Sequence, residues 1–244
     1  MKELFLCKVF EKTISQVVDE NFVYARALHY LGIEFFETPD KKLKEICEER
    51  GLDRQKVIKS FYRFDSCPRL SFDDLAKYPI ELLTEYLKHS HHIFIKEKLP
   101  YIVNLVKKWK REDSLKSLFP EFVEDFIKHI YEEEDTTFEY IHILSELKKG
   151  SSSAAFKFLT AFNDYSLKSE FEEHQNDDEF GAIRSMISSL NPLDIHERVL
   201  IQEIQAFDRE MIYHAEIENG IFFPKAIVLE KEINKKIKIL STQN

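Results

Sequence analysis

The scarcity of glycine and proline is the feature that most constrains the fold of this chain. Only five glycines and seven prolines occur among its 244 residues, so few positions favour turns or interrupt a helix. Apolar residues make up 43% of the chain, enough for a buried core, and many of them recur at helical spacing. The sequence therefore predicts an all-α fold.

Four long periodic segments occupy the C-terminal part of the chain. They cover about residues 79–111, 120–149, 167–190, and 195 to at least 220. Pro100 lies inside the first segment and is expected to kink it. Long helices joined by short turns favour an antiparallel four-helix bundle. Shorter periodic stretches precede them, so we expect a small helical N-terminal domain over residues 1–65 and the bundle over residues 66–244.

Charge and cysteine usage exclude several classes of protein. The net charge of −9 argues against a nucleic-acid partner, because phosphate binding needs a basic surface. Cys7, Cys47 and Cys67 form no C-x-x-C pair, which indicates core packing in a reducing compartment. No apolar run approaches the roughly 18 residues of a membrane span, and charged residues interrupt the N-terminus too early for a signal peptide. We expect a cytoplasmic protein without a membrane partner.

The four long segments carry a twofold repeat of metal-binding residue types. A histidine is followed 37 residues later by an H-x-x-x-E pair, and a second histidine is followed 40 residues later by another such pair. Residues four apart lie on one helix face, so each pair can direct an imidazole and a carboxylate at one point. The candidate metal ligands are His92, His129, Glu133, His174, His214 and Glu218.

The composition of this ligand set predicts two metal ions. Four histidines and two carboxylates are too many for one ordinary site, and two bridging glutamates would give each metal two nitrogens and two oxygens. Imidazole with carboxylate suits iron or manganese. The ligand types leave iron and manganese open at this point, with room for an oxo or hydroxo bridge between the two metals.

Neighbouring histidines leave the first ligand open at this point. His89 shares a helix face with His92, whereas His91 points about 100° away from it, and spacing alone does not choose between His89 and His92.

Three further histidines are expected to have structural roles. His142 belongs to a third H-x-x-x-E pair but lies about 220° around the helix from His129, which indicates surface or inter-helix packing. His29 and His196 stand alone and are interpreted as hydrogen-bonded structural residues.

The motifs around the ligands resemble those of the Repair of Iron Centers family, whose C-terminal half is a hemerythrin-like di-iron bundle. Residues 214–224 are similar to the family's H-x-x-x-E-N-x-x-L-F-P, and residues 129–138 to its H-x-x-x-E-E-x-x-x-F-P, with Glu139 in place of the final proline. Glu173-His174 resembles the E-H of the family's third helix.

The resemblance also bears on the first ligand and on the N-terminal domain. In the family the first ligand lies seven residues before a Leu-Pro, so Leu99-Pro100 selects His92 over His89 and His91. Residues 32–35, Gly-Ile-Glu-Phe, resemble the start of the family's G-I-D-F-C-C-G-G, but Phe-Glu-Thr follows here and the paired cysteines are absent.

The resemblance implies a stress-response protein that helps to restore iron–sulfur clusters damaged by nitric oxide or oxidants. It also implies two non-haem irons with an oxo or hydroxo bridge, in preference to manganese. These irons would be donated to apo-clusters, or would bind and reduce nitric oxide, which would make the protein an enzyme. The implied partners are nitric oxide, oxygen and damaged iron–sulfur proteins, and the N-terminal domain is the candidate to mediate a homodimer.

Two alternatives stand beside this function. A hemerythrin-like module that binds or senses oxygen or nitric oxide without repair activity is favoured by the missing cysteines. A metal-free helical interaction domain would require the repeat of ligand types to be a coincidence.

Overall fold

The computed structural model describes residues 8–65, 70–111, 114–162, 165–174 and 180–241, with only the backbone described for residues 173–174 and 240–241. Every regular element within these ranges is helical, and the one extended pairing in them is an isolated bridge between Thr13 and Lys42. The expected all-α fold is confirmed. In the part of the chain that is described, none of the helices combines the length and apolarity needed to cross a membrane.

The chain divides into two compact units. Unit 1 comprises residues 1–69, 101–116 and 184–207, and unit 2 comprises residues 70–100, 117–183 and 208–244. The expected division at residue 65 therefore differs from the observed one, because unit 1 also includes two segments that the sequence interpretation assigned to the bundle.

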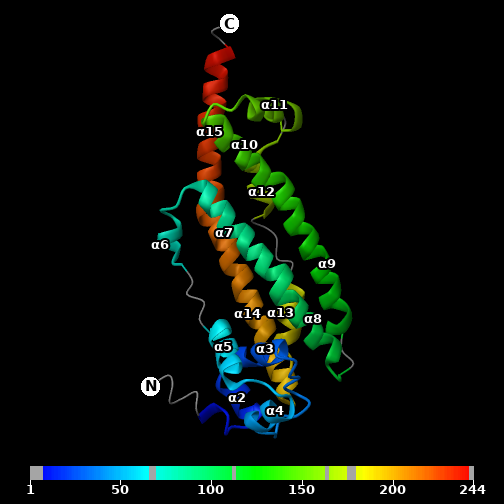
Figure 1. Cartoon of the computed structure of the whole chain (residues 1–244). Helices are drawn as coiled ribbons and strands as arrows, with labels where there is room; N and C mark the ends of the chain where they lie inside the picture. Colours follow the sequence, from blue (N-terminus) through cyan, green and yellow to red (C-terminus); the bar gives the residue numbers. More distant parts are fainter. Residues whose placement is uncertain (1–7, 66–69, 112–113, 163–164, 175–179, 242–244) are drawn as a thin grey trace. The chain divides into compact units, whose positions relative to one another are not determined.

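The N-terminal part of unit 1 consists of α2 (Ile14–Glu20), α3 (Val23–Tyr30), α4 (Leu43–Glu49) and α5 (Arg54–Asp65), drawn in blue to cyan in Figure 1. Thr13 begins α2 with a capping box, in which its hydroxyl accepts from the Gln16 amide and the Gln16 side chain accepts from the Thr13 amide. Gly32 ends α3 at φ +76°, where the Ile33 amide donates to the Leu28 carbonyl.

Buried contacts explain why the later segments belong to unit 1. Arg26 of α3 forms a buried ion pair with Glu203, and the His29 ring lies 5.1 Å from the Tyr101 ring. His196 stacks on Phe36 with ring centroids 4.2 Å apart. The short N-terminal helices thus complete their core with residues from 101–116 and 184–207, which no local sequence pattern reveals.

Three long helical stretches follow the N-terminal helices. The first is α7 (Ile80–Ile93), η1 (Phe94–Lys98) and α8 (Leu99–Lys108). The second is α9 (Leu115–Glu133), η2 (Glu134–Phe138) and α10 (Glu139–Lys148), and the third is α14 (Ile195–Ile217), η3 (Glu218–Phe222) and α15 (Phe223–Ser241).

The shorter elements are α6 (Phe72–Leu75), α11 (Ser152–Ala161), α12 (Leu167–His174) and α13 (Gly181–Ser188). The segment expected as one helix over 167–190 is thus described as α12 and α13, and residues 175–179 lie outside the description.

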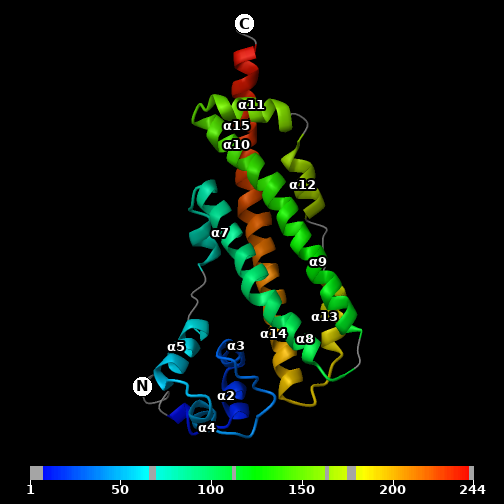
Figure 2. The same cartoon turned by 45° about the vertical axis from the view of Figure 1, so that its right-hand side comes forward.

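Within unit 2, α15 packs against α10 and α12, and α7 packs against η3. In both views α7, α9 with α10, and the adjoining part of α14 with α15 lie side by side (Figures 1 and 2). The shared core is apolar and includes Leu83, Leu87, Phe138, Phe222 and Phe223. The antiparallel four-helix arrangement itself stays a prediction.

Each long helical stretch contains one π-helical turn, η1, η2 or η3. Pro100 and Pro224 are each the second residue of the helix that follows such a turn. The amide just before each proline donates five residues back, Leu99 to Phe94 and Phe223 to Glu218. The wider turn accommodates a proline ring that would clash with the carbonyl four residues back in a regular α-helix. The chain consequently stays helical through Pro100.

Candidate metal centre

Four side chains from three helical stretches of unit 2 converge on one point. They are His91 of α7, Glu133 of α9, His214 of α14 and Glu218 of η3. One nitrogen or carboxylate oxygen of each lies within 4.8 Å of the corresponding atom of every other. His91 is 2% exposed, Glu133 8% and Glu218 1%, and the His214 side chain is 11% exposed. These ligand-type atoms therefore meet inside the protein.

The two histidines face each other through their Nε2 atoms. His91 Nε2 lies 3.0 Å from His214 Nε2 and 3.5 Å from Glu133 Oε2, and His214 Nε2 lies 2.9 Å from Glu218 Oε1. The opposite ring nitrogen of His91, Nδ1, lies 2.8 Å from Glu134 Oε1. The nitrogens and oxygens that line the point of convergence make an N2O2 donor set.

Local helix geometry explains the placement of these residues. His214 and Glu218 are four apart at the end of α14, so their side chains share a face. His91 lies three residues before η1, Glu133 lies immediately before η2, and Glu218 is the first residue of η3. All three π-helical turns thus lie beside the cluster, a position that such turns frequently occupy in functional sites.

Aromatic side chains surround the histidines. The Phe138 ring lies parallel to the His91 imidazole, with centroids 5.6 Å apart, and Phe94 meets His214 edge-on at the same centroid distance. Phe222 packs against Phe138 in turn. These apolar neighbours keep water from the buried donor atoms.

The buried environment of the cluster disfavours the charged forms of its side chains. Burial raises the pKa of Glu133 well above its ordinary value, and the negative charge of Glu218 and a hydrogen bond with it add to the increase. Burial, together with the positive charges of His214, His129 and Lys88, lowers the pKa of His91 to about 3, against the opposing effect of Glu218. The protein therefore disfavours both the carboxylates and the imidazolium, and a cation at the centre would relieve the repulsion between the carboxylates.

An unsatisfied buried atom also fits a metal ion. Glu133 Oε1 is buried and has no hydrogen-bond partner among the described residues. Such groups are uncommon in folded proteins and call for an explanation such as a bound ion. Imidazole and carboxylate together suit divalent iron, manganese or zinc. The residues present fit a metal.

The structure brings together three of the six ligands expected from the sequence, Glu133, His214 and Glu218. The first expected ligand, His92, is not in this group. His92 is exposed, and its neighbour His91 lies in the cluster. The reason is the rotation of α7 about its axis, because His91 continues the buried face that Leu83 and Leu87 begin. Four-residue spacing from buried leucines was the sequence signal that could have identified His91.

The other two expected ligands are His129 and His174. His129 is half-buried and lies outside the group of four, although its charge affects the pKa of His91. The side chain of His174 lies outside the described residues.

The three histidines expected to have structural roles lie outside the cluster of four. His142 is exposed, and His29 and His196 pack against aromatic rings in unit 1. Among the cysteines, Cys47 is buried with a free thiol, as core packing requires, whereas Cys7 and Cys67 lie outside the described residues.

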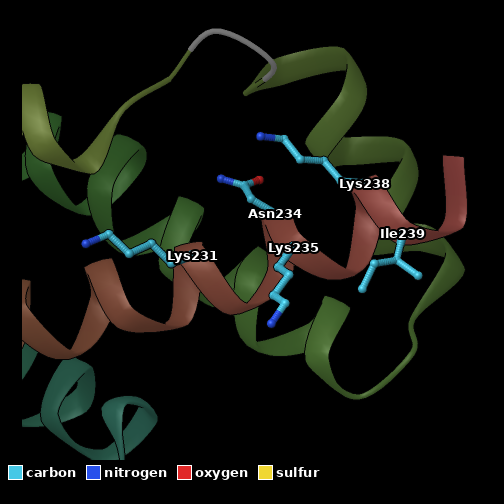
Figure 3. A pocket seen from close by; sticks show the side chains of 5 residues that line it. All are labelled: Lys231, Asn234, Lys235, Lys238 and Ile239. Carbon is cyan, nitrogen blue, oxygen red and sulfur yellow. The ribbon is translucent and has the colours of Figure 1, made fainter. Parts of the chain in front are cut away.

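A separate pocket lies along α15. It is lined by Lys231, Asn234, Lys235, Lys238 and Ile239, whose side chains spread from one helix (Figure 3). Amines dominate this lining and no carboxylate or imidazole contributes, so the pocket does not suit a metal ion.

Comparison with known proteins gives no relative. No protein-family model, no curated protein and no solved structure matches this chain.

Proposed function

We propose that this chain is a di-iron protein of the iron–sulfur cluster repair type. The observation that carries the proposal is the buried convergence of His91, Glu133, His214 and Glu218, whose donor atoms lie within 4.8 Å of one another. An N2O2 set inside an apolar core is costly to maintain without a cation, because buried charges need partners. His91 and His214 would hold metal through Nε2, and the glutamates through their carboxylate oxygens.

A second iron would draw on His129 and His174. His129 is one turn before Glu133 on the same helix, so it lies on the same face. Its positive charge also lowers the pKa of His91. Together with the cluster, these two histidines give the four imidazoles and two carboxylates of the twofold repeat, with His91 in place of His92.

The repair role is supported by the resemblance of residues 214–224 and 129–138 to the Repair of Iron Centers motifs. Iron bound there would supply redox chemistry and could bind a small ligand such as nitric oxide or oxygen. The chain contributes the surroundings: Phe94 and Phe138 pack against the imidazoles and exclude water from them, and Glu134 Oε1 lies 2.8 Å from His91 Nδ1. Apolar surroundings of this kind admit a small uncharged gas more readily than an ion.

A hemerythrin-like sensor of oxygen or nitric oxide is the second candidate. It is favoured by the residues after Gly32-Ile33, where Phe35 and Phe36 stand and the family's paired cysteines do not. A sensor needs the metal centre and has no need of those thiols.

Metal analysis tests the shared premise of both functions. The full chain, reconstituted anaerobically with ferrous iron and freed of excess metal, is expected to retain close to two irons per chain. His214→Ala and Glu218→Ala should lose most of this iron, and His142→Ala, which changes an exposed histidine, should retain it. Wild-type protein that retains no iron would overturn the proposal.

A second experiment separates repair from sensing. The iron-loaded protein is incubated with an enzyme whose iron–sulfur cluster has been destroyed by nitric oxide. Recovery of that enzyme's activity supports repair. Reversible gas binding by the iron-loaded protein without recovery supports the sensor.

A further inference from the structure

Glu134 is a second carboxylate beside the cluster and is not one of the four convergent residues. It is the first residue of η2 and directly follows Glu133. Its Oε1 lies 2.8 Å from His91 Nδ1, the ring nitrogen that faces away from the point of convergence. A carboxylate oxygen accepts, so His91 Nδ1–H donates this hydrogen bond.

Glu133 and Glu134, which are consecutive in the sequence, therefore lie beside opposite ring nitrogens of His91. Glu133 Oε2 lies 3.5 Å from Nε2, and Glu134 Oε1 lies 2.8 Å from Nδ1. Because successive side chains of a helix point about 100° apart, the pair can reach the inner and the outer edge of the ring. The parallel Phe138 ring, also from η2, restricts the tilt of the imidazole.

The two histidines of the cluster differ in this respect. His91 has an ionisable partner on its outer nitrogen, whereas the outer nitrogen of His214, Nδ1, is buried and has no hydrogen-bond partner in the described part of the chain. The Glu134 side chain is also 28% exposed, in contrast to 3% for His91, so the carboxylate can stay hydrated while it accepts from the ring.

We propose that Glu134 is a positioning residue that fixes the tautomer and orientation of His91, so that Nε2 presents its lone pair to the metal. The proposal rests on the proposed metal centre. A carboxylate on the outer nitrogen increases the basicity of a ligating imidazole, and loss of such a partner typically costs roughly 10- to 100-fold in metal affinity. Glu134 thus makes His91 a stronger metal ligand than His214, although both histidines would bind the metal through Nε2.

The first test uses the metal-free protein and examines the tautomer alone. Nitrogen-15 NMR of histidine-labelled full-length protein should show His91 protonated at Nδ1. Glu134→Ala should give a mixture of tautomers or protonation at Nε2, with His142 as the internal reference. A His91 ring that is protonated at Nδ1 to the same extent in the variant would overturn the proposal, whatever the metal content.

The second test measures metal affinity. Cobalt(II) replaces iron as an air-stable probe, and competition with a chelator gives the dissociation constant of the full chain. Glu134→Gln keeps an accepting oxygen but removes the charge, and Glu134→Ala removes both, so we expect affinity to fall modestly in the first and by roughly 10- to 100-fold in the second. Glu132→Gln, an exposed neighbour paired with Lys128, is the matched control and should be unchanged.

The outcomes separate the two proposals. Wild-type protein that binds no cobalt and no iron overturns the metal centre. Wild-type binding with the same affinity in both Glu134 variants overturns the role of Glu134 and leaves the metal centre standing. In a His91→Ala background, Glu134→Ala should cause no further loss, because the residue acts through that ring.

Discussion

The Nε2 atoms of His91 and His214 lie 3.0 Å apart, although 123 positions separate the residues in the sequence. Two imidazole nitrogens at that separation must share a proton or face a common cation, since two lone pairs or two N–H groups would repel. The carboxylates of Glu133 and Glu218 lie beside them. This relationship between α7 and α14 defines the candidate metal centre.

The choice between His91 and His92 is directly testable. His91→Ala should reduce metal affinity by at least about tenfold, the loss seen when ligand geometry is disturbed, because its Nε2 faces the other donors. His92→Ala should leave metal affinity unchanged, because His92 is exposed and outside the cluster. Equilibrium competition with a chelator measures both constants, and the reverse order would restore His92 as the ligand.

The buried pair of Arg26 and Glu203 should govern the stability of unit 1. Glu203→Leu leaves the Arg26 charge buried without its counter-ion, which typically costs about 3–5 kcal/mol. The double variant Arg26→Met, Glu203→Leu should recover most of this loss. Urea unfolding of the metal-free protein measures the free energies.

A surface pair provides the control for this experiment. Arg198 and Asp19 are half-exposed, so Asp19→Asn should change the free energy of unfolding by less than about 1 kcal/mol. Equal losses in Glu203→Leu and Asp19→Asn would show that burial of the pair does not matter.

His196 should make unit 1 sensitive to acid. Burial lowers its pKa below the ordinary value of 6.5, an effect that outweighs the charges of Asp194, Glu197 and Glu34 and a backbone hydrogen bond with Leu105. The unfolded chain therefore binds a proton more readily than the folded one. The stability from neutral His196 is fully present above about pH 6.5 and is lost as the pH falls through the folded-state pKa.

The measurement compares wild-type protein with His196→Gln. Thermal unfolding of the metal-free proteins between pH 7.5 and pH 5 should show a steeper decrease in Tm for wild type. Parallel pH dependence in the two proteins would contradict the role of His196.

We expect the Phe72 ring to be the reason why position 220 of η3 is a glycine. A Cβ built at Gly220 lies 2.6 Å from Phe72 Cζ, closer than atoms can pack. Alanine in a helix ordinarily stabilises by roughly 0.5–1 kcal/mol relative to glycine, and we expect the displaced Phe72 ring to cancel that gain. Gly220→Ala should stabilise only in a Phe72→Ala background, and a double-mutant cycle of unfolding free energies checks the coupling. Additive effects would mean that the ring moves away without cost.

Sequence patterns alone determined the helical class and much of the local structure. Few glycines and prolines predicted long helices, Gly32 ended α3, and Asp53 accepts from the Gln55 amide at the start of α5. The H-x-x-x-E spacing also placed His214 and Glu218 on one face. These features depend on interactions within a few residues, which the sequence records directly.

Tertiary structure decided which side chains meet. A rotation of α7 by one residue, about 100°, separates His91 from His92, and the packing of Leu83 and Leu87 fixes that rotation. The limits of unit 1 likewise depend on contacts such as Arg26 with Glu203, which are 177 positions apart. Periodicity shows that a helix has a buried face, but only its packing partners determine which residues at the margin of that face reach the site.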